Sequence, residues 1–263
     1  GEKFTAENIR SIRPGYGAKP KYFGDFLTMQ AERDLKRGEP LSFEDVREGC
    51  VLFLTNNSNT DRFFERLKEL VPYAVRMSNA LTREIVDAIK PSFVISFNYR
   101  HIVKADVIEA LEGRIINLHT SLLPYNKGAS PNVFSFLEDT PKGVTIHQMA
   151  PGLDTGDILY VKKTDILDGE TCGNLMDRLS ILGADAIIES FDDILSGKIV
   201  PKKQDECQSS YTKIIKKQDA LIDWSKSNYE IVNLVRAFNP APISYTFYKG
   251  EMIKAFEENG IKT

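Results

Sequence analysis

Three residues of this chain have the types and spacing needed for acyl transfer to an amine. Asn117 and His119 stand two apart in Asn-Leu-His-Thr-Ser-Leu-Leu-Pro, and Asp154 lies in Gly-Leu-Asp-Thr-Gly-Asp. If residues 114–119 form a strand, Asn117 and His119 point to one face, because side chains alternate along a strand. An amine that attacks a formyl carbon generates an oxyanion, which an amide N–H and an imidazolium can stabilise while a carboxylate orients and charges the imidazole. We therefore take Asn117, His119 and Asp154 as candidate catalytic residues.

A lone Asn-x-His pair would indicate only the end of a strand that satisfies its own backbone groups. Here Ser-Leu-Leu-Pro follows directly, and the Asp154 motif comes later in the same arrangement. This combination resembles the folate-dependent formyltransferases, the family that includes methionyl-tRNA formyltransferase, glycinamide ribonucleotide transformylase and the sugar N-formyltransferases. The resemblance is strong over residues 51–161 and weaker as far as residue 256. It implies N10-formyltetrahydrofolate as the formyl donor and assigns the family's catalytic triad to the three residues above.

The elements that must position these residues follow an α/β pattern. Short apolar runs alternate with helical spacing over residues 48–203, as a doubly wound sheet requires. The sequence predicts strands at 51–54, 93–96, 114–118 and 144–149, and helices at 61–70, 82–89, 132–137 and 172–195. We expect an α/β fold with a Rossmann-like formyltransferase sheet.

A segment of a different kind precedes this sheet, and a further segment follows it. Residues 1–47, with Glu-Asn-Ile-Arg-Ser-Ile-Arg-Pro-Gly-Tyr-Gly, resemble the small antifreeze-like (SAF) domain of pseudaminic and sialic acid synthases, and their Pro and Gly predict short strands and turns. Residues 207–263 resemble the start of the small C-terminal α+β module of methionyl-tRNA formyltransferases, with one strand pair at 244–248 and 252–256. The expected domains are 1–47, 48–206 and 207–263. We expect residues 1–47 to be dispensable for the chemistry.

Composition is that of an ordinary globular enzyme. The 263 residues are 42% hydrophobic, enough to bury a core. No apolar run approaches the roughly 18 residues of a membrane helix, and the N-terminus lacks a signal peptide's apolar core, so we expect a cytoplasmic protein with no membrane partner. A net charge of −3 gives no broad basic surface, so we expect no nucleic-acid partner. The three cysteines lack C-x-x-C spacing, which indicates neither a metal site nor a disulfide framework.

The resemblance also implies where the formyl donor binds. In the family, the end of the strand before the catalytic one and the loop before the catalytic Asp hold the pteridine, mostly through backbone groups. That position is the carboxyl edge of an open sheet, where ligands collect. For Phe97 and Tyr99, ordinary strand packing is an equally good interpretation. The expected donor-binding residues are Phe97, Asn98, Tyr99, Leu123, Pro151, Gly152 and Leu153.

Two other stretches are candidates for the acceptor. Asn57 and Asn59 lie in a polar strand-to-helix turn, where they would contact substrate or simply cap the helix that follows. The stretch Tyr-Asn-Lys-Gly at 125–128 is similar to that of sugar formyltransferases, and Lys127 would face a pyrophosphate, a folate carboxylate or water. The expected substrate-binding residues are Asn57, Asn59, Tyr125, Lys127 and Asn132.

These resemblances together favour one reaction. We expect a formyl transfer to the 4-amine of a nucleotide-linked amino sugar, with a UDP sugar favoured and UDP-4-amino-4,6-dideoxy-L-AltNAc as the acceptor, in pseudaminic acid biosynthesis for cell-surface polysaccharide. The alternatives are a methionyl-tRNA formyltransferase-like enzyme and a non-catalytic appendage of a nonulosonic acid synthase. Association with or fusion to such a synthase and a homodimer are further expectations.

Overall fold

The computed structural model describes residues 1–13 and 15–256, which form two compact units. Unit 1 contains residues 1–118 and 148–151, and unit 2 contains residues 119–147 and those from 152 onward. The division falls within a strand, because Leu118 ends unit 1 and His119 begins unit 2.

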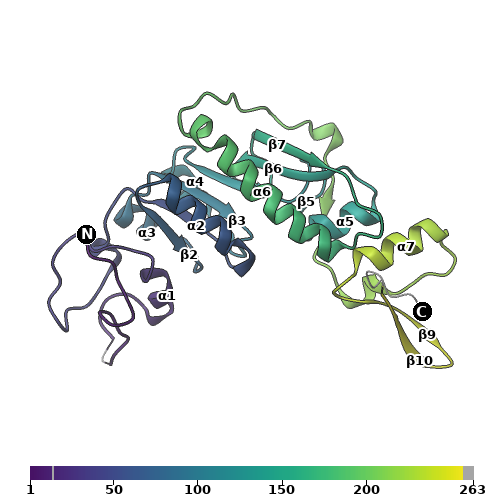
Figure 1. The fold of residues 1–263 in the computed structure, drawn as a ribbon, viewed down its shortest axis with the longest axis horizontal. Helices are drawn as coiled ribbons and strands as arrows, with labels where there is room; N and C mark the ends of the chain where they lie inside the picture. Colours follow the sequence, from purple (N-terminus) through teal and green to yellow (C-terminus); the bar gives the residue numbers. More distant parts are fainter. Residues whose placement is uncertain (14, 257–263) are drawn as a thin grey trace. The chain divides into compact units, whose positions relative to one another are not determined.

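Unit 1 is built on parallel strands in the order β2-β1-β3-β4 (Figure 1). These strands are β1 Val51–Leu54, β2 Ala74–Met77, β3 Phe93–Phe97 and β4 Ile115–His119. Their residues are nearly all buried, as expected for short apolar strands covered on both faces. The connecting helices are α2 Asp61–Leu70, α3 Arg83–Ile89 and α4 Ala105–Ala110.

Local sequence explains why these helices form and how they pack. The side chain of Thr82 accepts a hydrogen bond from the N–H of Ile85 and so caps α3. Helix α2 buries Phe63, Phe64 and Leu67 on one face, and the Phe63 ring packs edge-on against Phe53 of β1, with ring centroids 4.9 Å apart. The aromatic pair of α2 is therefore core.

The N-terminal segment, residues 1–47, belongs to the core of unit 1. It forms short turns of helix, namely η1 Pro20–Tyr22, α1 Phe23–Phe26 and η2 Phe43–Asp45. Phe4, Phe26 and Met29 are buried in one cluster with Leu52 and Val75 of the sheet. The turns expected here are present, but instead of the expected short strands the described residues of this segment form helical turns and isolated β-bridges, and they pack on the sheet of unit 1.

Polar contacts attach the same segment to the edge of that sheet. The hydroxyl of Thr28 accepts a hydrogen bond from the N–H of Arg76 and donates one to its carbonyl, both at 3.0 Å. The buried carboxylate of Asp25 accepts from the N–H of Ser78 at 2.8 Å and from the amide of Asn79 at 2.9 Å. The Thr28 bonds satisfy backbone groups of β2, the first strand in the order and an edge that would otherwise be exposed, and the Asp25 bonds hold the residues that follow it.

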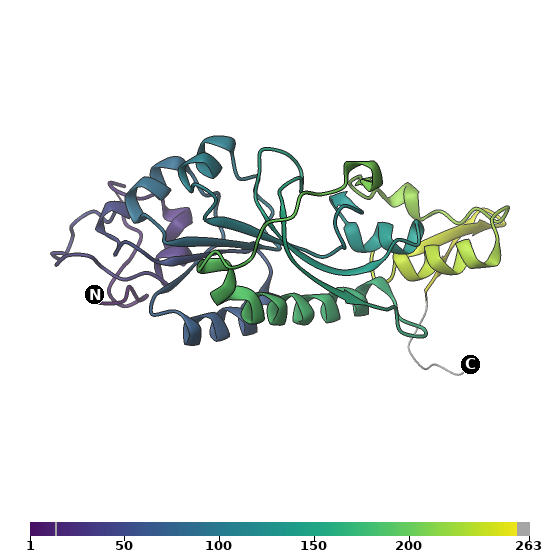
Figure 2. The ribbon, with the colours of Figure 1, turned by 90° about the horizontal axis from the view of Figure 1, so that it is seen from above.

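Unit 2 contains an antiparallel pair, β6 Lys142–Gln148 with β7 Ile158–Thr164, of which Gln148 belongs to unit 1. The helices are α5 Pro131–Leu137, the long α6 Cys172–Leu195, which packs along β7 (Figure 2), and α7 Asn228–Ala237. A short parallel pair joins β5 Lys127–Gly128 to β8 Tyr211–Thr212. Two 3-10 turns, η4 Glu206–Gln208 and η5 Lys217–Ala220, and the hairpin of β9 Ser244–Tyr248 with β10 Glu251–Ala255 complete the unit.

Most elements predicted from the sequence are confirmed within a residue or two, including α6 and the C-terminal hairpin. The prediction did not include β2, α4 or β7. Strand β7 alternates intermediate and exposed positions, so it lacks the apolar run that identifies a buried strand. No helix in the described residues is long and apolar enough to span a membrane.

Candidate active site

The carboxylate of Asp154 lies between two imidazoles in unit 2. Its Oδ2 is 3.6 Å from Nδ1 of His119, and its Oδ1 is 3.6 Å from Nε2 of His147. The two imidazole rings are nearly perpendicular, with centroids 6.4 Å apart. One carboxylate therefore faces both histidines from a buried position.

Backbone groups fix the rest of this cluster. The N–H of Gly128 donates to Oδ2 of Asp154 at 2.9 Å, and Nε2 of His119 lies 3.0 Å from the carbonyl oxygen of Asn126. Because a carbonyl can only accept, Nε2 carries the hydrogen in that bond. The lone pair of a neutral His119 is then on Nδ1, which faces Asp154.

Burial and neighbouring groups act in opposite directions on the pKa values of His119 and Asp154. Burial lowers the pKa of His119 below its usual value, and the charge of His147 lowers it further, although Asp154 and the Asn126 carbonyl raise it. For Asp154, burial raises the pKa, but His147, the charge of His119 and the Gly128 N–H together lower it to about 2. The sequence led us to expect that Asp154 keeps His119 charged. Instead, burial outweighs the carboxylate, so the neutral imidazole is favoured near neutral pH.

Asn117 occupies the expected place on β4, two residues before His119. Alternation along the strand therefore places both side chains on the same face of β4, with Leu118 on the other. Asn117 belongs to unit 1, and His119 and Asp154 belong to unit 2.

Asp154 lies at a constrained point of its loop. Its φ is +53°, a left-handed conformation that is uncommon outside glycine and is favoured for Asp and Asn among the other residues. Gly152 has φ +149°, and a Cβ there would come within 2.4 Å of the Thr155 hydroxyl. The glycine of the Gly-Leu-Asp-Thr-Gly-Asp motif is therefore required by the shape of the loop.

The expected donor-binding residues in unit 1 differ in what they can offer. Phe97 is only 1% exposed, and the hydroxyl of Tyr99 donates to the carbonyl of Asn79 at 2.7 Å. Both side chains thus serve packing, so contacts from them to a pteridine would have to come from backbone groups. Asn98 between them has φ +52°, and its carbonyl accepts from Asn56 at 3.1 Å. Pro151, the other expected donor residue of this unit, is exposed.

The expected donor-binding residues Leu123 and Leu153 in unit 2 differ in exposure. Leu153, next to the catalytic carboxylate, leaves 58% of its surface exposed. It lies above Gly128, where a Cβ would come within 3.0 Å of the Leu153 side chain. An exposed leucine over a glycine offers an apolar surface to a ring such as a pteridine. Leu123, by contrast, is buried, and its N–H donates to Thr145.

The turn that contains Asn57 and Asn59 in unit 1 is held by hydrogen bonds among its own residues. The side chain of Asn57 accepts from the N–H of Asn59 at 3.0 Å, and Thr60 donates its hydroxyl to the carbonyl of Asn57 at 2.6 Å. These bonds give Asn57 the structural capping role that the sequence left open beside a substrate role.

The acceptor candidates in unit 2 are more buried than the sequence suggested. The Lys127 side chain is fully buried, and its ammonium binds the carboxylate of Glu206 at 2.9 and 3.1 Å. The hydroxyl of Tyr125 donates to the side chain of Gln208 at 2.8 Å. Asn132 is buried, and its Oδ1 has no hydrogen-bond partner among the described residues.

His147 is the residue of the cluster that the sequence did not assign to the site. It lies on β6, and its contact with Asp154 places its imidazole beside the carboxylate. Its place in Gly-Val-Thr-Ile-His, shortly before the Asp154 motif, was the available signal. No group of three or more His, Cys, Asp or Glu side chains in the described part of the chain could hold a metal ion.

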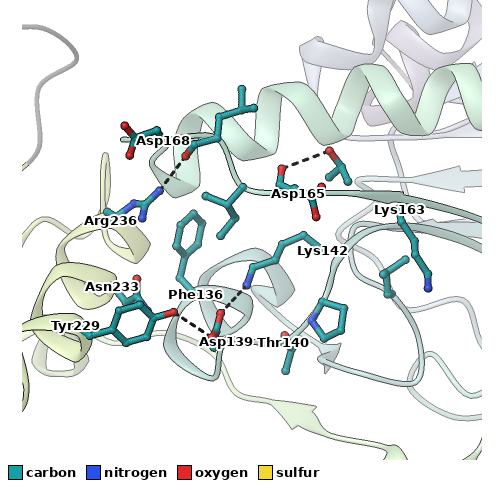
Figure 3. A pocket seen from close by; sticks show the side chains of 15 residues that line it. Phe136, Asp139, Thr140, Lys142, Lys163, Asp165, Asp168, Tyr229, Asn233 and Arg236 are labelled. Carbon is teal, nitrogen blue, oxygen red and sulfur yellow. Dashed lines mark hydrogen bonds and ion pairs between the residues drawn. The ribbon is translucent and has the colours of Figure 1, made fainter.

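A cavity of about 680 Å³ lies elsewhere in unit 2, and His119 and Asp154 do not line it (Figure 3). The hydroxyl of Tyr229 and the ammonium of Lys142 both bind the carboxylate of Asp139, at 3.0 and 3.3 Å. Arg236 donates to the carbonyls of Leu167 and Glu170. These polar groups of the wall are engaged with the protein, which indicates a structural role in attaching α7.

Three stretches of the chain match known families. Residues 55–191 match the family described as Formyl transferase, residues 214–261 match Formyl transferase, C-terminal domain, and residues 1–47 match SAF domain. The resemblances seen in the sequence are thus confirmed. The stretch 192–213 lies outside all three matches.

Individual proteins extend this similarity. The methionyl-tRNA formyltransferase of Clostridium novyi (strain NT) is 35% identical over 231 residues, which cover 88% of this chain and 71% of that protein. That of Geotalea daltonii (strain DSM 22248 / JCM 15807 / FRC-32) is 40% identical over 177 residues, which cover 66% of this chain and 57% of that protein. The crystal structure of the formyltransferase PseJ from Anoxybacillus kamchatkensis, in complex with UDP-4,6-dideoxy-4-formamido-L-AltNAc and tetrahydrofolate, is 32% identical, with a TM-score of 0.59 over 71% of this chain and 97% of that one.

Proposed function

Because the chain belongs to the formyl transferase family, we propose that it transfers a formyl group from N10-formyltetrahydrofolate to the 4-amine of UDP-4-amino-4,6-dideoxy-L-AltNAc. The family supports a folate-dependent formyltransferase, and the acceptor is the proposal. The product of this reaction is UDP-4,6-dideoxy-4-formamido-L-AltNAc, the compound bound in the PseJ structure. A cytoplasmic enzyme, a homodimer and a role in pseudaminic acid and cell-surface polysaccharide synthesis belong to the same proposal, as do the domains 1–47, 48–206 and 207–263.

One geometric observation carries the proposed chemistry. The Asp154 carboxylate faces Nδ1 of the buried His119 and is itself held by the Gly128 N–H. A carboxylate with a pKa of about 2 remains charged at any working pH and stabilises positive charge on the imidazole. The imidazole of His119 can thus accept a proton while the carboxylate of Asp154 stays where it is.

The roles of the residues follow from these charges. The bound donor supplies an electrophilic formyl carbon. His119 is neutral before the reaction, so its Nδ1 accepts a proton as the sugar amine attacks, and the imidazolium is then stabilised by Asp154. When the tetrahedral intermediate collapses, the bond between the formyl carbon and N10 breaks, and the imidazolium returns the proton to N10 of the leaving tetrahydrofolate. Asn117 donates its amide N–H to the formyl oxygen as negative charge develops there. We assign donor binding to the residues that the family implies, of which Leu153 offers an exposed apolar side chain.

The N-terminal match supports the sugar pathway. Residues 1–47 match SAF domain, and their sequence resembles the small domain of pseudaminic and sialic acid synthases. On this ground we assign to the chain an amino-sugar precursor of those acids as its acceptor. This argument favours the UDP sugar over dTDP-4-amino-4,6-dideoxyglucose, and it extends to association with a synthase of that pathway.

A second candidate acceptor is methionyl-tRNA, favoured by the named relatives at 35% and 40% identity. The formal charge of −3 opposes it, because tRNA binding rests on clustered Lys and Arg. Saturable tRNA binding that weakens steeply with salt would support the tRNA reaction. A non-catalytic appendage is the third alternative, and a single turnover with any acceptor excludes it.

A thermal-shift panel tests the acceptor directly, because a ligand that binds the native state raises its stability by mass action. The panel contains UDP- and dTDP-linked 4-amino sugars and initiator tRNA, each with a non-reactive folate analogue. We expect the UDP-4-amino sugar to raise the melting temperature most. A larger effect of tRNA, or no effect of any nucleotide sugar, contradicts the proposal.

A further inference from the structure

Residues 202–212 form a connecting segment that holds two loops of the active site. At its start, Lys202 and Ile158 exchange both backbone hydrogen bonds, at 2.7 and 2.8 Å, directly after the Asp154 loop. At its end, β8 pairs with β5, where Gly128 donates to Asp154. Between these points, Ser210 accepts from the N–H groups of Asn126 and Lys127 at 2.9 and 2.8 Å.

Gln204 binds the backbone of the Asp154 loop through its side-chain amide. Its amide nitrogen donates to the carbonyl of Asp154 at 2.8 Å and to that of Gly156 at 2.7 Å. Its Oε1 is buried and has no partner within the described residues. The orientation of the amide is therefore set by its two donor bonds, since exchanging the oxygen and nitrogen would place the oxygen against two carbonyls.

We propose that Gln204 is a positioning residue that holds Asp154 in place for His119. Asp154 has a positive φ and lies in a loop, so its side-chain direction depends on where its own carbonyl is fixed. The two bonds from Gln204 fix this carbonyl and the one two residues later. Gln204 lies in the stretch that no family match covers, so its function is assigned only by this geometry.

The consequence is an electrostatic link between the connecting segment and His119. The charge of Asp154 raises the pKa of His119 against the effect of burial. If the Asp154 loop moves, His119 loses part of this stabilisation, and its imidazolium becomes less favourable. A displacement of about 1 Å in a catalytic group can cost on the order of 10²-fold in rate.

The test uses Gln204→Met, which keeps the length of the side chain and removes both donors without adding charge. The chain has three histidines, so their titrations can be followed separately by NMR in the ligand-free protein. We expect the midpoint of His119 to move to lower pH in Gln204→Met, in the same direction as in Asp154→Asn but by less. Unchanged amide signals around β3 in unit 1 show that the variant is folded.

Gln218→Met is the matched control, because Gln218 is exposed on η5 and takes the same substitution. With whichever acceptor the wild type uses, we expect Gln204→Met to lower kcat about 10- to 100-fold, with much smaller changes in KM. Should Gln204→Met fail to fold, Gln204→Asn keeps the amide but is one methylene too short, and the same titration shift is expected.

The proposal is overturned if the His119 midpoint in Gln204→Met, or in Gln204→Asn where Met does not fold, equals that of wild type. It is also overturned if kcat in the folded variant remains within about twofold of wild type. The inference rests on the proposed function only for its kinetic part. If the acceptor assignment fails, the histidine titration still decides the role of Gln204.

Discussion

Nδ1 of His119 lies 3.6 Å from Oδ2 of Asp154, in a pair whose side chains are only 8% and 14% exposed. At this distance the two groups interact by charge more than by a direct hydrogen bond. Burial lowers the pKa of His119 and the carboxylate raises it, so the protonation state of the imidazole depends on both.

Asp154→Asn should lower the rate and shift its pH dependence. Replacing the carboxylate removes the charge that raises the pKa of His119, so the acidic limb of kcat/KM moves to lower pH. The maximum rate should fall by about 10²-fold or more, because the imidazolium is no longer stabilised. Measuring kcat/KM over a pH series for wild type and Asp154→Asn tests this prediction. Titration of the acceptor amine affects the two proteins equally. An unchanged acidic limb would remove Asp154 from its assigned role.

The same carboxylate makes stability depend on pH. The pKa of Asp154 falls from 3.8 to about 2 on folding, so its stabilisation is fully present above about pH 4 and is lost as the pH falls towards 2. The shift corresponds to about 2 kcal/mol of unfolding free energy. Urea unfolding of wild type and Asp154→Asn should differ at pH 7 and converge towards pH 2.5. A difference that stays constant over this range would show that Asp154 is not linked to folding in this way.

The N-terminal segment should be required for the stability of unit 1. Phe26 is 3% exposed and stacks on Phe43 with ring centroids 4.8 Å apart, so Phe26→Ala should cost about 3–5 kcal/mol. Leu27→Ala, at a neighbouring residue that is 38% exposed, is the control and should cost much less. Urea unfolding compares the two variants.

Removal of residues 1–47 gives a sharper version of this test. The deletion removes Thr28 from the edge of β2 and uncovers apolar core, so hydrogen exchange in β2 should lose its protection. A truncated protein that stays folded with β2 still protected would contradict this prediction.

Substitutions at the Lys127–Glu206 pair separate packing from substrate binding. Glu206→Gln leaves the buried ammonium of Lys127 without its carboxylate, whereas Lys127→Met removes the charge and leaves Glu206 exposed to water. We expect Glu206→Gln to lower the urea midpoint more than Lys127→Met does. If Lys127→Met instead leaves stability unchanged and raises KM for the acceptor, Lys127 binds substrate as the sequence first suggested.

The sequence predicted those parts of the fold and site whose signal is local. The strand that carries Asn117 and His119, the apolar spacing of α6 and the glycine-bracketed Asp154 loop were all visible in residue types and spacing. The packing of residues 1–47 could not be predicted, because the sequence of a SAF-like segment does not indicate the surface on which its Phe and Met residues pack.

Contacts between residues that are far apart in the chain could not be predicted from the sequence either. Gln204 and Asp154 are far apart in the chain, and a glutamine in a polar stretch looks the same whether it bonds to a loop or to water. The burial of Lys127 likewise depends on Glu206 and Tyr211, which come much later in the chain. The lowered pKa of His119 could not be predicted because it follows from full burial, and a histidine at a strand end need not be buried.

The central claim is that this chain formylates a UDP-linked 4-amino sugar. The most direct test is the ratio of kcat/KM for UDP-4-amino-4,6-dideoxy-L-AltNAc to that for dTDP-4-amino-4,6-dideoxyglucose and for methionyl-tRNA, each with N10-formyltetrahydrofolate, since specificity is this ratio. Asn117→Ala and His119→Ala serve as folded controls that should lose more than about tenfold in rate. We predict a clear preference for the UDP sugar with formation of the 4-formamido product. A preference for the dTDP sugar or for methionyl-tRNA would contradict the claim.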